Sequence, residues 1–341
     1  MKPESTTVGW RRASIYDVAK LAGVSHMTVS RVLNGHPNIR ESTRKRVLEA
    51  IEETNFTRSS IARALATQRA MRIGVLVDSP VHYGPNSTLR ALENAAREHG
   101  YSVSAVSFPE DDEARVDDGI LELVTQGVDG LCMIAPRVSS LENLRRRASE
   151  LPTLVVQADP VAGMHTAAVD QRAGAIAAVH HLLELGHEQI LHLAGPLDWY
   201  DSRARAEGWA NALEAAGLPR AEPIIGDWSS DSGYEVGKNH DLDGATAIFA
   251  SNDQMALGLI HGMAERGIRV PHDISVVGFD DLPDARHFLP PLTTIRQDFA
   301  SLGELILSLL IAAIEGTPTS GRHLIEPTLI VRESTAAPRL R

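Results

Sequence analysis

The 341-residue sequence has few aromatic residues, a single cysteine and no long hydrophobic run. One cysteine, Cys132, cannot build a disulfide framework, and its apolar surroundings, 130–134, indicate a buried thiol rather than a nucleophile. No apolar run approaches the roughly 18 residues of a membrane span, and the polar start, 1–7, contains no signal-peptide core. We therefore expect a cytoplasmic protein without a membrane segment.

A net charge of −11 would by itself argue against a nucleic-acid partner, but the charge is unevenly distributed. Residues 1–69 contain 12 Lys and Arg against 6 Asp and Glu, a balance of +6. The remainder contains 21 basic and 38 acidic side chains, a balance of −17. A basic head on an acidic body places any phosphate-binding surface at the N-terminus.

Three short helices are predicted near the N-terminus. Ser14 and Asp17 have the spacing of a capping box at the start of the first helix, and Gly23 ends that helix in a tight turn. Ser25 can cap the second helix, and Asn38 offers a cap-like start for the third. Three helices with a glycine in the turn between the first two are typical of a helix-turn-helix domain.

From Met71 onward, apolar runs with the length of strands alternate with helical stretches. The strand candidates are 72–77, 102–107, 130–134, 153–156, 189–193, 246–249 and 275–278. Alternation at this spacing predicts parallel sheets covered by helices. Because the body is too long for one sheet, we expect two α/β lobes with a cleft between them.

The segment from Ile15 to Asn34, IYDVAKLAGVSHMTVSRVLN, resembles the DNA-binding segment of the lactose-repressor (LacI/GalR) family of transcriptional regulators. A second helix that is short and polar at its start can enter a major groove about 12 Å wide. The resemblance implies base contacts by His26, Met27 and Arg31, and phosphate contacts by Ser25, Thr28, Ser30 and Asn34. Arg31 can donate two hydrogen bonds to guanine, whereas Met27 offers only apolar contact.

Residues 59–66 resemble the hinge helix of the same family, which folds on the DNA minor groove as a symmetric pair. The resemblance places Leu65 where an apolar side chain wedges between base steps, and Ala62 on the side that faces the groove. The family's usual Tyr-x-Pro-Asn entry is replaced by the sequence Phe-Thr-Arg-Ser at 56–59. A plain linker is the alternative interpretation of this segment.

The resemblance continues through the body to about Val331, where motifs such as LAGPL at 193–197 and SNDQMAL at 251–257 are similar to the lactose-repressor branch of the family. It implies effector contacts by Arg205, Trp228, Asn252, Asp280, Gln297 and Phe299. Arginine, amide and carboxylate groups suit the hydroxyls of a sugar, and aromatic rings cover its apolar face. Three of the polar residues follow strand-like runs, where α/β sheets place ligands, although each taken singly could be a helix cap or surface residue.

Two positions depart from the lactose-repressor pattern. Asp78 ends the first strand and Gln157 follows the fourth, and His82 next to Tyr83 is also foreign to that pattern. We expect Asp78, His82 and Gln157 to contact the end of the ligand that lies against the N-terminal lobe, which leaves the exact sugar open.

Nothing in the sequence favours an enzyme. It contains no dinucleotide-binding glycine motif after a strand, no phosphate loop and no Gly-x-Ser-x-Gly elbow. The paired histidines at 180–181 lie within a helix and the acidic cluster at 110–113 is best interpreted as a solvated loop, so neither a metal nor a cofactor is expected. Two other classes stay open, a regulator that answers to a partner protein or phosphorylated metabolite, and a secreted sugar-binding protein.

The sequence thus predicts an all-α helix-turn-helix head and an α/β two-lobed body similar to type I periplasmic binding proteins. The expected function is that of a homodimeric repressor that binds palindromic operator DNA and is released by a small neutral saccharide, a galactoside or glucoside first. The expected organisation is a flexible tail over 1–13, a DNA-binding domain over 14–57, a hinge helix and linker over 58–70, an effector-binding and dimerisation domain over 71–334 and a C-terminal tail over 335–341.

Overall fold

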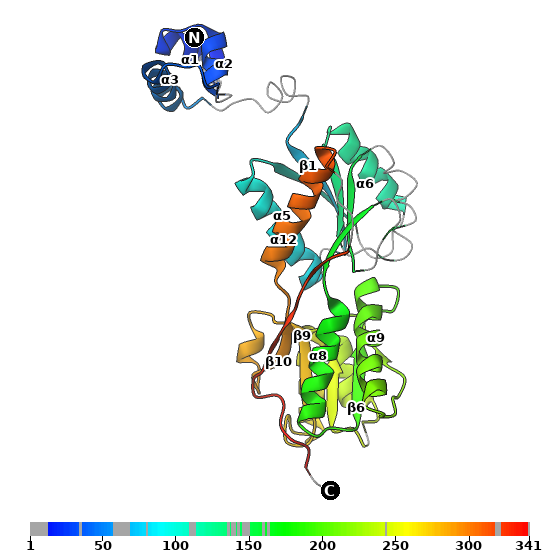
Figure 1. The fold of residues 1–341 in the computed structure, drawn as a ribbon. Helices are drawn as coiled ribbons and strands as arrows, with labels where there is room; N and C mark the ends of the chain where they lie inside the picture. The colour runs from blue at the N-terminus through cyan, green and yellow to red at the C-terminus, as the bar shows by residue number, and fades with distance from the viewer. Residues whose placement is uncertain are drawn as a thin grey trace, which may run out of the picture. The chain divides into compact units, whose positions relative to one another are not determined.

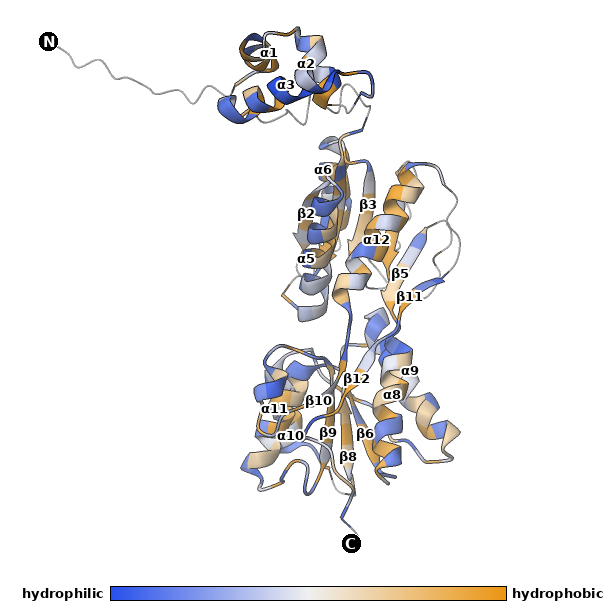
Figure 2. Cartoon of the chain, turned by 60° about the vertical axis from the view of Figure 1, so that its left-hand side comes forward, coloured by the Kyte–Doolittle hydropathy of each residue, from blue (hydrophilic) through white to orange (hydrophobic). Residues whose placement is uncertain are grey.

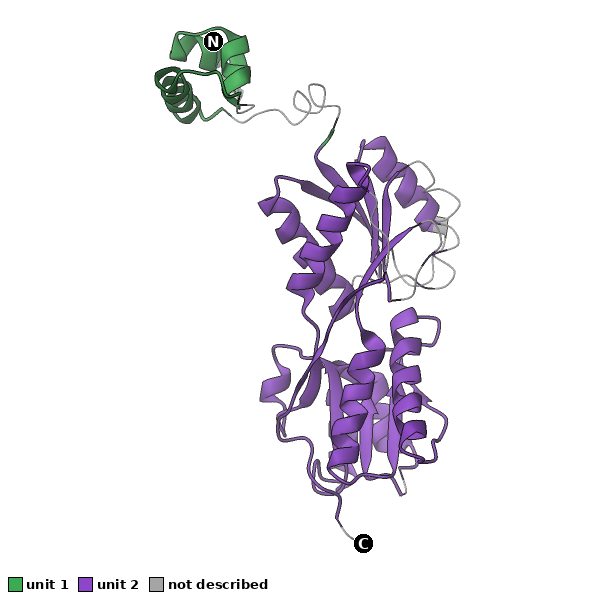
Figure 3. Cartoon of the chain, viewed as in Figure 1, with its two compact units in different colours: residues 1–70 green, residues 71–341 purple. Residues whose placement is uncertain are grey.

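The structure is a computed structural model, and it divides the chain into two compact units between Ala70 and Met71 (Figure 3). That boundary is also where strand–helix alternation begins in the sequence. The structure describes residues 13–33, 36–56, 69–79, 81–108, 114–134, 137, 141, 144, 151–158, 161, 164–242, 244–317 and 322–339. Three of the expected DNA-contacting residues, Asn34, Ala62 and Leu65, lie outside these ranges, as do the expected hinge helix over 59–66 and the N-terminal residues 1–12.

In the part of it that the structure describes, the first unit contains three helices, α1 (Ile15–Ala22), α2 (His26–Leu33) and α3 (Glu41–Thr54). The predicted capping box is confirmed, because Ser14 Oγ accepts from the Asp17 amide and Asp17 Oδ2 accepts from the Ser14 amide at 2.8 Å. Gly23 adopts the left-handed conformation with φ 64°, as the tight turn requires.

A small apolar core holds the three helices together through Val18, Val29 and Val47, one from each helix and all fully buried. The start expected for the third helix was wrong. The helix begins at Glu41, and Asn38 lies in the turn before it, where its amide donates to His36 Nδ1 at 3.4 Å.

The second unit consists of two α/β lobes, each with a six-stranded sheet (Figure 1). The N-terminal lobe has the strand order β11-β5-β4-β3-β1-β2, with all neighbours parallel. Its strands are β1 (Arg72–Asp78), β2 (Ser102–Phe108), β3 (Gly130–Ile134), β4 (Thr153–Val156), β5 (His165–Val169) and β11 (Arg322–Ile325), and its helices include α5 (Tyr83–Glu98), α6 (Ala114–Thr125) and α12 (Phe299–Ile314).

The C-terminal lobe has the strand order β12-β10-β9-β8-β6-β7, which is parallel except for the antiparallel edge strand β12. Its strands are β6 (Ile190–Ala194), β7 (Ile224–Ile225), β8 (Ala247–Ala250), β9 (Ser275–Asp280), β10 (Thr293–Arg296) and β12 (Thr328–Ile330). Its helices are α8 (Gln171–Glu184), α9 (Tyr200–Ala215), α10 (Ser230–Asn239) and α11 (Asp253–Glu265), with a short 3₁₀ turn, η1 (Ala285–His287).

The predicted pair of α/β lobes is therefore confirmed, while five strands escaped the sequence analysis. Of the missed strands, β5, β10, β11 and β12 have three to five residues and carry Thr, His or Arg among the apolar residues, and β7 is only two residues long, so none forms a clear apolar run. Most of the predicted strands are strongly apolar, as the colouring of β8 and β9 in Figure 2 shows, whereas β2 alternates Ser with apolar residues. No helix in the described part of the chain is long and apolar enough to cross a membrane.

The chain passes between the lobes three times, after β5, after β10 and between β11 and β12. After the last passage, the segment expected to be a tail from residue 335 starts against the C-terminal lobe. Thr335 Oγ1 bonds His181 Nε2 at 2.9 Å, and the Ala336 carbonyl lies 2.8 Å from His187 Nε2. This segment therefore begins as part of the C-terminal lobe.

Candidate functional site

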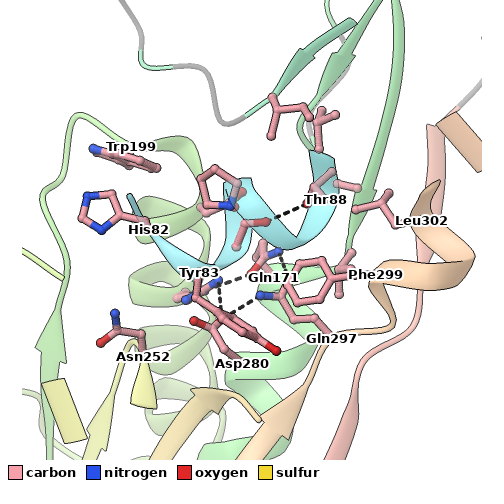
Figure 4. A pocket seen from close by; sticks show the side chains of 18 of the residues that line it. His82, Tyr83, Thr88, Gln171, Trp199, Asn252, Asp280, Gln297, Phe299 and Leu302 are labelled. Atoms are coloured by element: carbon pink, nitrogen blue, oxygen red, sulfur yellow. Dashed lines mark hydrogen bonds and ion pairs between the residues drawn. The ribbon is translucent and has the colours of Figure 1, made fainter. Parts of the chain in front are cut away.

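A cavity lies between the two lobes of the body (Figure 4) and encloses about 640 Å³, counted with the part open to solvent. Strand ends from both sheets reach it, among them Ile134 of β3, Val169 of β5 and Asp280 of β9. Parallel sheets place ligands at the carboxyl ends of their strands, so the cavity lies where this fold binds ligands. The lining residues predicted from the sequence are His82, Arg205, Trp228, Asn252, Asp280, Gln297 and Phe299.

Four buried polar side chains form a closed ring at the floor of the cavity. Arg205 Nε donates to Gln171 Oε1 at 2.9 Å, and Gln171 Nε2 donates to Gln297 Oε1 at 2.9 Å. Gln297 Nε2 donates to Asp280 Oδ1 at 2.7 Å, and the same oxygen lies 3.6 Å from Arg205 Nη2. The ring holds donors and acceptors in fixed positions before any ligand binds, which lowers the entropic cost of binding.

Arg205 is held on further sides as well. Its Nη1 donates to the carbonyl of Ser251, and its guanidinium carbon lies 3.8 Å from the centroid of the Phe279 ring. With only 4% of the residue exposed, the charge is stabilised by protein groups rather than by water.

Asp280 is the last residue of β9 and has an unusual backbone, with φ 108°. Burial raises the pKa of its carboxyl to about 6, against the opposing effects of Arg205 and the hydrogen bond from Gln297. The protonation of this group therefore changes close to neutral pH.

Asn252 is both a helix cap and a cavity residue. Its Oδ1 accepts from the Met255 amide at 2.8 Å and so caps α11, and its Nδ2 donates to the Trp228 carbonyl at 2.9 Å. Trp228 has a positive φ of 72°, and this hydrogen bond helps to hold that backbone. Asn252 therefore serves both as the N-cap of α11 and as a lining residue of the cavity.

Aromatic rings cover the cavity from both lobes. The rings of His82 and Trp199 meet edge to face at 5.5 Å, and Trp199 in turn meets Trp228 at 5.8 Å. Tyr83 and Phe299 form a similar pair at 5.8 Å. Figure 4 shows His82 next to Trp199 on one side of the cavity and Tyr83 next to Phe299 on the other. Such rings can stack on the apolar face of a ligand ring.

Two expected contacts, Asp78 and Gln157, are not among the residues that line this cavity. The Asp78 carboxylate is fully buried and accepts from Arg137 Nε at 3.0 Å and from Arg137 Nη2 at 3.1 Å. Gln157 is 3% exposed. The structure therefore places both side chains outside the lining of the cavity, and it engages the Asp78 carboxylate in an ion pair inside the N-terminal lobe.

Other cavity residues escaped the sequence analysis, chiefly Gln171, Trp199 and Asp201. Trp199 and Asp201 follow β6 just as Asn252 follows β8, so the rule that selected Asn252 could have found them. No described residue donates a hydrogen bond to the Asp201 carboxylate. Burial raises the pKa of this carboxyl, and Arg205, one turn further along α9, opposes the shift.

The second candidate site is the outer face of α2 in the head. Val29 and Val32 pack inward, so Met27, which is 56% exposed, and Arg31 point to solvent one turn apart. Ser25 Oγ accepts from the Thr28 amide at 3.2 Å and so caps the helix, and the ring of His26 lies 5.1 Å from that of Tyr16. The structure thus presents His26, Met27 and Arg31 on the exposed face of a helix with a capped N-terminus, while Thr28 and Ser30 are half-buried.

Cys132 lies fully buried in β3, and burial raises the pKa of its thiol. Among the residues that the structure describes, no group of three His, Cys, Asp or Glu is placed to hold a metal ion.

Two family models match the chain. Residues 14–59 match the bacterial regulatory proteins of the lacI family, and residues 179–335 match a periplasmic binding protein-like domain. The two matches cover the three-helix head and most of the C-terminal lobe.

Among curated relatives, the lactose operon repressor of Escherichia coli K12 is 33% identical over 329 residues, which cover 95% of this chain and 91% of the relative. The HTH-type transcriptional repressor PurR of Haemophilus influenzae (strain Rd) is 35% identical over 335 residues, which cover 94% and 98%. Both relatives are repressors rather than enzymes.

Among solved structures, the lac repressor dimer bound to operator and the anti-inducer ONPF superposes with a TM-score of 0.85 at 33% identity and covers 96% of this chain and all of that one. The complex of the transcriptional regulator CelR with cellobiose gives a TM-score of 0.69 at 29% identity and covers 95% and 100%.

Proposed function

The chain belongs to the LacI family of bacterial regulatory proteins, and from this premise we propose that it is a transcriptional repressor released from palindromic operator DNA by a small neutral sugar. The observation that carries the effector part is the closed polar ring of Arg205, Gln171, Gln297 and Asp280 beneath a set of aromatic side chains. Fixed donors and acceptors below aromatic rings match a pyranose, which has hydroxyls at its rim and apolar C–H groups on its face.

Operator binding is assigned to the head. The excess of six positive charges over residues 1–69 lies in the unit that carries the exposed face of α2. The solved relative in complex with operator is a dimer, and symmetric operators require a two-fold partner, so we propose that this chain also binds DNA as a homodimer. Affinity should fall steeply with salt, because phosphate contacts release counterions.

Arg31→Ala is expected to weaken binding to the best operator by roughly 1–3 kcal/mol and to relax the preference at one base pair. The reason is the loss of a bidentate contact to guanine, since Arg31 is exposed on the outer face of α2. Fluorescence anisotropy with operators substituted one base pair at a time measures both effects. Lys45→Ala removes one positive charge from α3 as the matched control, and equal weakening of every sequence by Arg31→Ala would identify Arg31 as a phosphate contact.

The charges of the cavity favour a neutral effector over a phosphorylated one. Among the described residues that line the cavity are two carboxylates, Asp201 and Asp280, and a single Lys or Arg, which is Arg205. Because Arg205 already pairs with Asp280, a phosphate group would meet no unengaged cation there. A regulator of the same family with a phosphorylated effector or a partner protein is therefore the weaker alternative.

Effector binding is proposed to change the arrangement of the lobes. The cavity takes residues from both lobes, so a ligand that contacts both stabilises one lobe arrangement over another. Such a ligand lowers operator affinity only by its difference in affinity between the two states.

Calorimetric titration tests the effector class directly. The panel contains methyl galactosides, methyl glucosides, pentoses, purines and a sugar phosphate, and the expected result is binding of a galactoside or glucoside first. Tight binding of a purine or a sugar phosphate, with no heat from any neutral sugar, would overturn the sugar assignment and leave the DNA assignment standing.

Effector affinity is expected to fall as pH falls below about 6, the pKa of Asp280. The ionised carboxylate accepts hydrogen bonds from sugar hydroxyls, so a ligand that needs this form binds about tenfold more weakly at pH 5 than at pH 7.5. Titration of the binding sugar across this range measures the effect. The Asp280→Asn variant should bind the sugar more weakly at every pH, and its affinity should not depend on pH. If the variant instead keeps the pH dependence of wild type, another group is responsible for the titration.

A further inference from the structure

Asp253, the first residue of α11, is fully buried and is not among the residues that line the cavity. Its Oδ1 accepts from the Thr294 hydroxyl at 2.6 Å, and its Oδ2 accepts from the Leu282 amide at 2.8 Å. The carboxylate thus joins the start of α11 to strand β10 and to the turn that follows β9. Nothing in the effector site described above uses this group.

The turn that Asp253 holds has a strained backbone. Asp280 and Asp281 are consecutive non-glycine residues with positive φ, 108° and 51°. Such conformations persist only where the surrounding structure fixes them. Leu282, whose amide binds Asp253, immediately follows the strained pair, and Thr294 Oγ1 also accepts from the Asp281 amide at 3.4 Å.

The strand next to Asp253 is adapted to the close approach of the carboxylate. A Cβ atom at Gly278 would lie 2.2 Å from Asp253 Oδ1, so only glycine fits at this position of β9. From the other side, Asp281 pairs with Arg296 at 2.7 Å and with Arg332 at 2.6 Å. Arg296 is more than half exposed, so its ion pair stabilises the turn only weakly.

We propose that Asp253 is a positioning residue of the effector site, which holds the turn 280–282 so that the Asp280 carboxylate points at Arg205, Gln297 and the ligand. The proposal rests on the proposed function. Because Asn252 precedes Asp253 at the start of α11, this one helix terminus positions both a cavity amide and the cavity carboxylate. Asp253 acts on effector affinity through Asp280 and not through contact with the ligand.

The test uses Asp253→Asn and the isosteric Thr294→Val in the full-length protein, with methyl β-galactoside and methyl β-glucoside as probes. Both variants are expected to lower the affinity for the sugar that binds wild type by tenfold or more, with operator affinity in its absence unchanged within twofold. The double variant Asp253→Asn/Asp280→Asn should bind no more than twofold more weakly than Asp280→Asn alone. If the loss of sugar affinity in the double variant equals the product of the two single losses, Asp253 acts independently of Asp280 and the proposal is overturned.

Hydrogen exchange of peptides that cover 278–284 gives a readout without any ligand. Exchange should rise tenfold or more in Asp253→Asn and in Thr294→Val, and stay unchanged in Asp273→Asn. Asp273 is the matched control. Its carboxylate also stabilises a turn, through hydrogen bonds from Arg269, but this turn lies at the opposite end of β9. Unchanged exchange in the first two variants, or faster exchange with unaltered sugar affinity, overturns the positioning role. If wild type binds neither glycoside, the sugar assignment fails, and the exchange measurement alone decides whether Asp253 holds the turn.

Discussion

Arg205→Ala is expected to abolish the response to the effector while operator binding persists, so that the variant behaves as a super-repressor. The change removes the donors to Gln171 Oε1 and the Ser251 carbonyl and leaves the Asp280 carboxylate without its cation. Loss of one partner of a buried ion pair costs about 3–5 kcal/mol. That cost falls on the stability of the folded variant, whereas the affinity for the binding sugar falls through the charged hydrogen bonds that the site loses, each worth about 1.5–3 kcal/mol, and so by roughly tenfold to 100-fold.

Calorimetry with the binding sugar and anisotropy with operator DNA separate the two activities of this variant. The matched control is Arg203→Ala, because Arg203 is exposed on the same helix and its Nε donates to the Leu197 carbonyl outside the ring. The control should keep wild-type sugar affinity. If Arg205→Ala still responds to the sugar at the concentrations that release wild type, the polar ring is not part of the effector site.

Gly258→Ala is expected to destabilise the C-terminal lobe by at least about 2 kcal/mol, in the upper part of the range for overpacking. A Cβ atom at this position of α11 would lie 1.8 Å from the Ser230 carbonyl oxygen and 2.6 Å from the Tyr234 amide nitrogen of α10. These are backbone atoms, so no side-chain rotation relieves the clash and the two helices must separate. The sign of this stability change is informative, because replacing glycine by alanine inside a helix ordinarily stabilises a protein by about 0.5–1 kcal/mol.

Thermal unfolding followed by tryptophan fluorescence measures this effect. Gly84→Ala is the control, since a Cβ atom on this α5 residue meets nothing within 4 Å and should leave the midpoint unchanged or slightly higher. An unchanged midpoint in Gly258→Ala would mean that α10 and α11 do not pack at the distance described.

Elements with strong local signals were predictable from the sequence. The capping box of Ser14 and Asp17, the glycine turn at Gly23 and the long apolar strands all depend on interactions within a few residues. The short strands β7, β11 and β12 lack such signals, because their pairing partners rather than their own composition hold them in the sheets.

The candidate site divides in the same way. Family motifs and strand-end positions pointed to Arg205, Asn252 and Asp280, and the structure brings all three to one cavity. Asp78 met the same strand-end rule, yet its carboxylate pairs with Arg137. A strand-end rule identifies the edge of a sheet, but it does not identify the partner of a charged side chain there.

The amino-acid sequence by itself determined the three-helix head, the basic and acidic division of the chain and the alternation that builds two α/β lobes, because each depends on composition or on local periodicity. Only the tertiary structure decided the closed polar ring, the ion pair of Asp78 with Arg137 and the hydrogen bonds by which Asp253 holds the turn after β9. Gln171 and Gln297 are 126 residues apart, and their hydrogen bond exists because separate passages of the chain between the lobes bring α8 and the end of β10 together. Contacts between such distant residues leave no pattern in the sequence around either residue, because the fold of the whole chain, and not the neighbouring residues, brings the two side chains together.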